Sequence, residues 1–308
     1  FSMLTTLAAR HFGITPAFVE KDYWLTLILN RLAHSTYSEQ VVFKGGTSLS
    51  KGYRLINRFS EDIDIATINE NLTGNALKTK IRTIEKEITI DVTEIVEPKL
   101  TSKGSMYRKS VFEYPSAIVE LTDNTPKRII VEINSFANPY PFVKQTITSF
   151  ITEFLLTTNQ QETAEEYGLQ PFTLNILDKR RTMLEKIVSL IRFSFAENPT
   201  VALANKIRHF YDLYYLLNDA ECAEYIQSSD FQKDFAELLA HDQQMFETPA
   251  VWRDKTVKDS SLVSDFTALW ESLRTTYQTE LATLAFSEIP NESIIRNNFM
   301  KMIQWINF

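Results

Sequence analysis

Two short clusters in the first quarter of the chain could bind a phosphorylated ligand and a metal ion. Gly45 and Gly46 end a β-branched run and let the backbone turn sharply, close to a ligand. Thr47 and Ser48 follow, and we expect them to cap a helix that runs to about Leu55. Free backbone N–H groups at such a helix start would favour a phosphate.

Asp62 and Asp64 form the second cluster, in the run DIDI. Because side chains two apart on a strand share a face, both carboxylates are expected on one side of a sheet. Two such neighbours repel each other unless a cation lies between them, and beside a phosphate the natural cation is Mg²⁺. Each cluster alone is more often an ordinary turn or a solvated strand end. Together, one helix apart, they indicate a metal and phosphate site.

The composition predicts a helix-rich globular chain of one large or two modest domains. It has 308 residues, of which 44% are hydrophobic, too many for a disordered chain. A single cysteine, Cys222, excludes an internal disulfide and fits a reducing, cytoplasmic location. No apolar run reaches the roughly 18 residues of a membrane-spanning helix, and no signal peptide is evident.

The net charge of −7 argues at first against nucleic acid as a partner, but the charge is uneven. Between Lys179 and Arg208, seven basic residues stand against two acidic ones, a local charge of +5. The later chain is clearly acidic. A locally basic face could still hold an RNA end or a nucleoside triphosphate.

The elements around the two clusters are expected to form a sheet with helices packed on it. Thr15 and Pro16 predict the start of a helix that runs to about His34. Strands are predicted at 107–114, 117–122 and 128–136, as an antiparallel extension of the sheet that carries the two aspartates. Prolines near 140 place a domain boundary there, giving a core over 1–140 and a mainly helical domain over 141–308.

The string FKGGTSLSKGYRLINRFSEDIDI resembles the AbiEii/AbiGii branch of toxins, which includes the MenT toxins. Gly-Gly, then Thr or Ser, a helix and Asp-x-Asp is similar to the signature of the DNA polymerase β-like nucleotidyltransferase fold. Two later segments, LEKIVSLIR and RHFYDLYYLL, are similar to segments that follow the core in this branch. The resemblance implies an α+β fold: a nucleotidyltransferase core with a mixed sheet flanked by helices, then a mainly helical C-terminal domain.

The resemblance also implies site residues beyond the two clusters. A polymerase β-like site needs a third carboxylate from a neighbouring strand, for which Glu132 is the first choice and Glu120 the alternative. Lys186 and Asp212 match by position the Lys and Asp that the family's later domain contributes to its active site. The expected catalytic set is therefore Asp62, Asp64, Glu132, Lys186 and Asp212, the first three of which hold Mg²⁺, with Mn²⁺ as an alternative. The expected nucleotide-binding set is Lys44, Gly45, Gly46, Thr47, Ser48, Lys51 and Arg58.

Two of these assignments leave an alternative open. Asp212 lies in an apolar and aromatic run, where a charge needs a partner. The ordinary partner is a nearby arginine such as Arg208 or Arg192, and the functional one is Lys186 with a substrate hydroxyl. In the N-terminal helix, the charged residues of EKDYWL, 20 to 22, could reach the nucleotide or form a solvated helix face.

The function that the resemblance implies is Mg-dependent transfer of a nucleoside monophosphate from an NTP to an acceptor hydroxyl. The protein would be the toxin of a toxin–antitoxin or phage-defence (abortive infection) pair, with a tRNA 3′ end as acceptor and a cognate antitoxin as partner. Two alternatives stay open. The acceptor could be a protein or a small molecule such as an antibiotic, or the chain could be an NTP-binding module that acts through its antitoxin.

Overall fold

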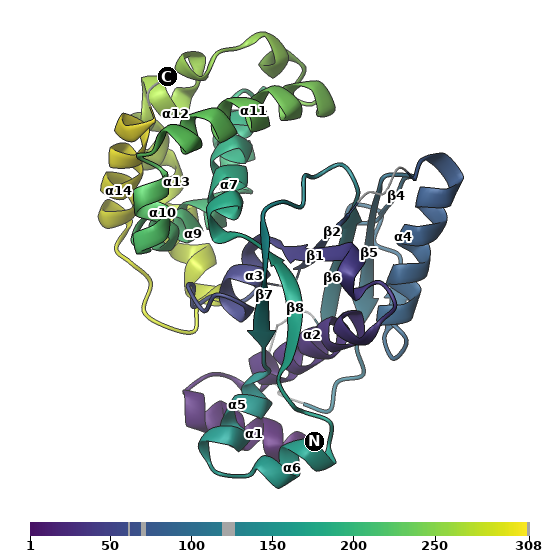
Figure 1. The fold of residues 1–308 in the computed structure, drawn as a ribbon. Helices are drawn as coiled ribbons and strands as arrows, with labels where there is room; N and C mark the ends of the chain where they lie inside the picture. Colours follow the sequence, from purple (N-terminus) through teal and green to yellow (C-terminus); the bar gives the residue numbers. More distant parts are fainter. Residues whose placement is uncertain (61, 69–71, 119–126, 307–308) are drawn as a thin grey trace. The chain divides into compact units, whose positions relative to one another are not determined.

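The computed structural model describes residues 1–60, 62–68, 72–118 and 127–306. By its internal contacts the chain divides into two compact units (Figure 1). Unit 1 comprises Phe1–Arg54 and Phe59–Asp178, and unit 2 comprises Leu55–Arg58 and Lys179–Phe308. A four-residue segment between the two predicted clusters, 55–58, therefore belongs to the second unit.

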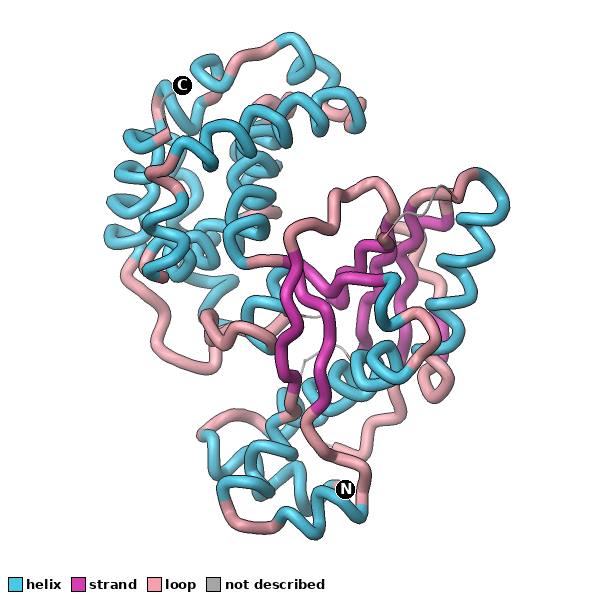
Figure 2. Tube along the Cα trace, viewed as in Figure 1, coloured by secondary structure: helices cyan, strands magenta, loops and turns pink. Residues whose placement is uncertain are grey.

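Unit 1 is built on a mixed sheet, drawn in magenta in Figure 2, whose strand order is β3-β5-β6-β2-β1-β8-β7, with β4 paired to β5. β2 lies between β1, to which it is antiparallel, and β6, to which it is parallel. The strands are β1 (Val41–Lys44), β2 (Asp62–Thr67), β3 (Thr93–Ile95), β4 (Ser102–Lys103), β5 (Tyr107–Glu113), β6 (Arg128–Asn134), β7 (Phe142–Ile147) and β8 (Phe172–Leu177).

Two helices, α2 and α4, pack against one face of this sheet. Their apolar side chains share a core with Ile63, Ile65, Val131 and Ile133, which alternate with the polar residues of β2 and β6. As predicted, Thr15 caps α2: its side chain accepts from the Phe18 N–H. The helices of unit 1 are α1 (Ser2–Phe12), α2 (Pro16–His34), α3 (Gly45–Lys51), α4 (Gly74–Ile88), α5 (Phe150–Thr157) and α6 (Gln161–Glu166), with a 3₁₀ turn at Ser38–Gln40.

The sheet differs from the sequence prediction in two ways. β6 is parallel to β2, so the predicted purely antiparallel extension is wrong at that join. The region after residue 140, expected to be mainly helical, begins instead with edge strand β7 against β8, and helix α5 starts only at Phe150. The sheet thus continues past the expected boundary near 140, and unit 1 extends to Asp178. The predicted strand over 117–122 lies mostly outside the described residues.

Unit 2 is helical in its described residues, as expected. Trp252 and Trp270 are fully buried, and Phe210, Phe266, Trp270 and Phe299 pack ring against ring. None of the described helices has the length and apolar character needed to cross a membrane. The elements are α7 (Lys179–Ser194), α8 (Pro199–Ala204), α9 (Ile207–Leu217), α10 (Ala220–Tyr225), α11 (Ser229–Met245), α12 (Ser261–Ser264), α13 (Phe266–Leu284) and α14 (Glu292–Trp305), with 3₁₀ turns at Ala250–Asp254 and Val257–Asp259.

Candidate active site

One row of charged residues crosses four neighbouring strands of unit 1. Asp64 on β2 pairs in register with Lys44 on β1 and with Glu132 on β6, and Glu132 in turn pairs with Lys109 on β5. Directly paired residues point to the same face of a sheet. The row therefore has two neighbouring carboxylates in the middle and a lysine at each end. Asp62, two residues before Asp64, shares the face of Asp64.

The predicted glycine turn lies directly against this row. Gly45 has φ +80°, a conformation that favours glycine, and an added Cβ would be 2.1 Å from Asp64 Oδ2. Any side chain at this position would displace the carboxylate or the backbone. A glycine is thus needed at position 45 both for the backbone conformation and for the space that the Asp64 carboxylate occupies. The structure therefore brings together the two clusters that the sequence predicted.

The helix after the turn starts earlier than predicted. α3 begins at Gly45 with Lys44 as N-cap and no side-chain capping bond, so the expected cap by Thr47 or Ser48 is wrong. Both hydroxyls are buried and used locally: Thr47 Oγ1 donates to the Asp62 carbonyl at 2.5 Å, and Ser48 Oγ to the Gly45 carbonyl at 2.8 Å. The Thr47 bond ties the start of the helix to the strand that carries the aspartates.

Glu132 lies beside Asp64 as predicted, but its carboxylate is occupied by neighbours on β5. Lys109 Nζ donates to Oε1 at 2.5 Å and the Tyr107 hydroxyl donates to Oε2 at 2.8 Å. Burial and the charge of Glu132 raise the pKa of Tyr107. Burial lowers the pKa of Lys109, yet Glu132, Asp62 and Asp64 outweigh it and raise that pKa overall.

The carboxylates of this face are the oxygen donors that Mg²⁺ prefers. Within the described residues, no three acidic, His or Cys side chains are close enough together to hold an ion as they lie here. Asp62 and Asp64 fit a divalent ion by chemistry and shared face, and the ammonium of Lys109 shows that this face stabilises a cation. Glu132 fits only if it leaves Lys109. The alternative, Glu120, lies outside the described residues.

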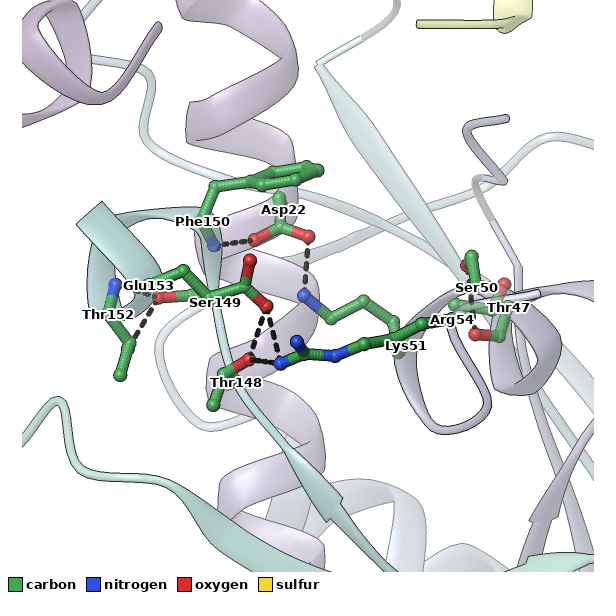
Figure 3. Close-up of polar contacts among 10 residues, drawn as sticks. All are labelled: Asp22, Thr47, Ser50, Lys51, Arg54, Thr148, Ser149, Phe150, Thr152 and Glu153. Carbon is green, nitrogen blue, oxygen red and sulfur yellow. Dashed lines mark hydrogen bonds and ion pairs between the residues drawn. The ribbon is translucent and has the colours of Figure 1, made fainter. Parts of the chain in front are cut away.

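Lys51, expected at a phosphate, is bound elsewhere in unit 1. Figure 3 shows its side chain reaching from the end of α3 to Asp22 on α2, with Nζ 2.6 Å from Oδ1. The other Asp22 oxygen accepts from the Phe150 N–H at the start of α5, at 2.8 Å. Asp22 thus joins three helices, and burial raises its pKa despite the Lys51 ammonium.

The neighbouring residues of the EKDYWL segment are buried as well. Glu20, Lys21 and Asp22 are each at most 3% exposed, so the interpretation as a solvated helix face is wrong. Glu20 accepts from the Ser116 hydroxyl and the Ala117 N–H, both at 2.6 Å. These contacts give Glu20 and Asp22 a structural role within unit 1.

A second charged cluster lies within unit 2, around Asp212 of α9. Arg58 donates to both carboxylate oxygens, from Nε to Oδ1 and from Nη2 to Oδ2, each at 2.7 Å. Lys186 of α7 is 2.8 Å from Oδ2. Burial alone would raise the pKa of Asp212, but Arg58 and Lys186 hold it below its ordinary value.

This cluster decides between the predicted partners of Asp212. Lys186 is confirmed as a partner, whereas Arg208 pairs with Glu280 at 3.6 Å and Arg192 stacks 3.9 Å from the Phe246 ring centroid. Sequence reasoning missed the arginine that does bind, Arg58, because it expected that side chain at a phosphate. The signal available was a lone arginine in the apolar run LINRF, where burial demands an acid.

Part of the predicted basic stretch is paired with acids inside unit 2. Besides the residues just named, Lys179 pairs with Asp219 at 2.8 Å and Arg180 lies over the Tyr225 ring. Burial lowers the pKa of Arg192. The local charge of +5 therefore overstates the positive surface that α7 and its neighbours offer to a nucleic acid.

The model of one protein family, described as nucleotidyl transferase AbiEii toxin of type IV toxin–antitoxin systems, matches residues 27–293. The chain belongs to the AbiEii toxin family. It is accordingly a nucleotidyltransferase and the toxin of a type IV toxin–antitoxin system, which implies an NTP substrate and an antitoxin partner. The matched range includes the glycine turn, both aspartates and the Lys186–Asp212 pair.

A solved structure with the same fold is that of the nucleotidyltransferase toxin MenT4 from Mycobacterium tuberculosis H37Rv. The two share 17% sequence identity with a TM-score of 0.59, over 98% of this chain and 92% of that one. No curated protein matches the chain. The likeness confirms the expected AbiEii fold of a mixed sheet flanked by helices.

Proposed function

We propose that this AbiEii toxin transfers a nucleoside monophosphate from an NTP to a hydroxyl at a tRNA 3′ end, with Mg²⁺ or Mn²⁺ held by Asp62 and Asp64. The observation that carries the proposal is the contact of Gly45 with the Asp64 carboxylate. It supports a site in which a phosphate-seating turn and a cation-seating acid pair are neighbours. Glu132 would become the third metal ligand by releasing the Lys109 ammonium and binding the ion in its place.

When bound, the divalent ion would supply Lewis-acid activation of the acceptor hydroxyl and neutralise charge on the departing pyrophosphate. The backbone N–H groups from Gly46 to Ser48 would seat the β and γ phosphates, because preorganised donors stabilise developing charge. Lys44, in register with Asp64, would neutralise a phosphate oxygen. Thr47 contributes by fixing α3 to the Asp62 carbonyl.

Lys186 and Asp212 are assigned to the same reaction on the strength of the family segments that they match. The Lys186 ammonium would bind a substrate phosphate. Asp212 is a poor proton acceptor, because Arg58 and Lys186 engage both its oxygens and hold its pKa low. Its expected contribution is to orient Lys186.

A transfer assay with each of the four labelled NTPs, offered with total tRNA, a protein extract or aminoglycoside antibiotics in separate reactions, tests this proposal. We expect label on tRNA only, with loss of transfer in EDTA and recovery in Mg²⁺ or Mn²⁺. Asp62→Asn and Asp64→Asn should each reduce turnover by about 1,000-fold or more. Asp91→Asn, at an exposed carboxylate, is the matched control and should have no effect.

Label on protein or on the antibiotic instead would identify a different acceptor for the same chemistry. NTP binding without transfer to any pool would favour a binding module that acts through its antitoxin. Full activity in Asp62→Asn would contradict the proposed metal site.

A further inference from the structure

The Glu132 carboxylate is held at both of its oxygens by two side chains of the neighbouring strand β5. Lys109 Nζ lies 2.5 Å from Oε1, and the Tyr107 hydroxyl donates to Oε2 at 2.8 Å. Lys109 is directly across from Glu132 in the sheet register, whereas Tyr107, two residues earlier, reaches it diagonally. Because residues two apart on a strand share a face, both contacts are made on the face that carries Asp62 and Asp64.

The two contacts differ in what they allow at Glu132. The Lys109 ammonium is a cation at an oxygen that a divalent ion would use. Since two cations repel each other strongly at such short range, Lys109 must leave Oε1 before an ion can bind there. The Tyr107 hydroxyl is neutral and donates to the other oxygen, so it can stay in place. Donors of this kind orient ligating carboxylates in metal sites.

The mobility of the two side chains agrees with this division. The Tyr107 ring packs against Phe136, with 6.2 Å between ring centroids, and a tyrosine side chain has only two torsions to fix. Lys109 carries its charge on a flexible four-carbon stem, and its side chain is 23% exposed. The ammonium can therefore move into solvent, whereas the phenol hydroxyl remains at Glu132.

We infer that Tyr107 and Lys109 have opposite effects on metal binding: Tyr107 positions Glu132 as a ligand, and Lys109 competes with the metal ion for it. This inference rests on the proposed function, because it takes Glu132 as the third metal ligand. The ion would bind in exchange for an internal ion pair. Its affinity would thus be lower than three freely available carboxylates would give.

The test measures Mn²⁺ binding to the metal-free protein by electron paramagnetic resonance, without nucleotide or catalysis. Glu132→Gln should weaken binding by about tenfold or more, because it removes a charged ligand. Tyr107→Phe should weaken binding by about tenfold, the usual cost of losing a group that orients a ligand. Lys109→Met should instead tighten binding by about tenfold, because a charge-assisted hydrogen bond no longer competes with the ion.

The same two substitutions in a Glu132→Gln background separate this mechanism from a general effect of charge. Lys109→Met should then tighten binding by about twofold at most, since only the repulsion between its ammonium and the ion is removed. Tyr107→Phe should then change nothing. Both effects are expected to depend on the Glu132 carboxylate.

Two matched controls remove the same chemical groups elsewhere in unit 1. Lys103→Met removes a lysine of β4 that is paired with Glu94, and Tyr140→Phe removes the hydroxyl of a tyrosine that is 50% exposed. Both should leave the Mn²⁺ affinity unchanged. Thermal unfolding shows whether each variant is folded, and Lys109→Gln carries the test if Lys109→Met is not.

Unchanged or weaker Mn²⁺ binding in Lys109→Met, or unchanged or tighter binding in Tyr107→Phe, would overturn the inference. So would a Lys109→Met gain that persists in full without the Glu132 carboxylate, or no Mn²⁺ binding by either the wild type or Lys109→Met. Unchanged binding in Glu132→Gln would also overturn it, yet would leave a metal site at Asp62 and Asp64 intact. If the wild type showed the expected affinities but transferred no nucleotide, only the proposed transfer would fail.

Discussion

Two buried aspartates of this toxin, Asp22 in unit 1 and Asp212 in unit 2, have opposite electrostatic settings. Asp22 faces one ammonium, Lys51, and one backbone N–H, and burial raises its pKa. Asp212 faces a guanidinium fork and an ammonium, and its pKa is lowered. Similar burial therefore gives opposite pKa shifts, because Asp212 has a second cation, whereas Asp22 has the Glu153 carboxylate nearby, which raises its pKa further.

The two aspartates differ in the number of cations that contact each of them. The Asp22–Lys51 pair is balanced, joins α2, α3 and α5, and leaves no charge over for a ligand. In the Asp212 cluster, two cations, Arg58 and Lys186, contact one carboxylate. Depth of burial alone would rank the two sites equally. We therefore predict their roles from the cations around each carboxylate: a structural role for Asp22 and a part in the transfer reaction for Asp212.

The largest expected effect comes from removing the negative charge of Asp212. Asp212→Asn leaves Arg58 and Lys186 as two buried like charges, so we expect transfer to fall by about 1,000-fold or more and the free energy of unfolding by about 3–5 kcal/mol. Urea denaturation and steady-state kinetics of the same preparation measure both. Normal turnover in Asp212→Asn would show that the reaction does not need the Asp212 carboxylate.

A smaller and purely structural effect is expected at the balanced pair. Asp22→Asn should lower the free energy of unfolding by about 2–4 kcal/mol, because it leaves Lys51 with little exposure and no anion. The double variant Asp22→Leu/Lys51→Met should recover much of this loss and keep the KM for NTP near its wild-type value. A large rise in KM in that double variant would indicate that Lys51 binds the nucleotide, as the sequence predicted.

The local elements could be predicted because each has a signal within a few residues. Thr15-Pro16 predicted the start of α2, and the alternation of DIDI predicted which side chains of β2 share a face. The family signature then supplied Lys186 and Asp212, whose contact the structure confirms.

The contacts that decide each charge's role could not be predicted, because they join residues far apart in sequence. Lys51 is bound by a residue 29 positions away and Arg58 by one 154 positions away. A lysine or arginine near a glycine turn has the same local pattern whether it binds phosphate or a buried acid. Lys109 was missed for the same reason, since only the β5–β6 register brings it to Glu132.

The smallest expected effect is a difference in how stability depends on pH. The pKa of Asp212 is lower in the folded state, so its contribution is present above about pH 4 and is lost as the pH falls below that value. The pKa of Asp22 is raised, so its contribution is full below about pH 4 and declines as the pH rises through the folded-state pKa. Each tenfold change in an acid constant corresponds to about 1.4 kcal/mol.

Urea denaturation between about pH 4 and 7 should therefore distinguish Asp212→Asn from Asp22→Asn. The two variants should differ in how much unfolding free energy they lose relative to wild type and in how that loss changes with pH. The gap between wild type and Asp212→Asn should stay nearly constant over this range, because above about pH 4 Asp212 is ionised in both the folded and the unfolded state. The gap between wild type and Asp22→Asn should narrow over the same range, because ionising Asp22 costs the native state free energy. If both gaps narrowed alike over this range, the two buried carboxyls would not differ in the direction of their pKa shifts.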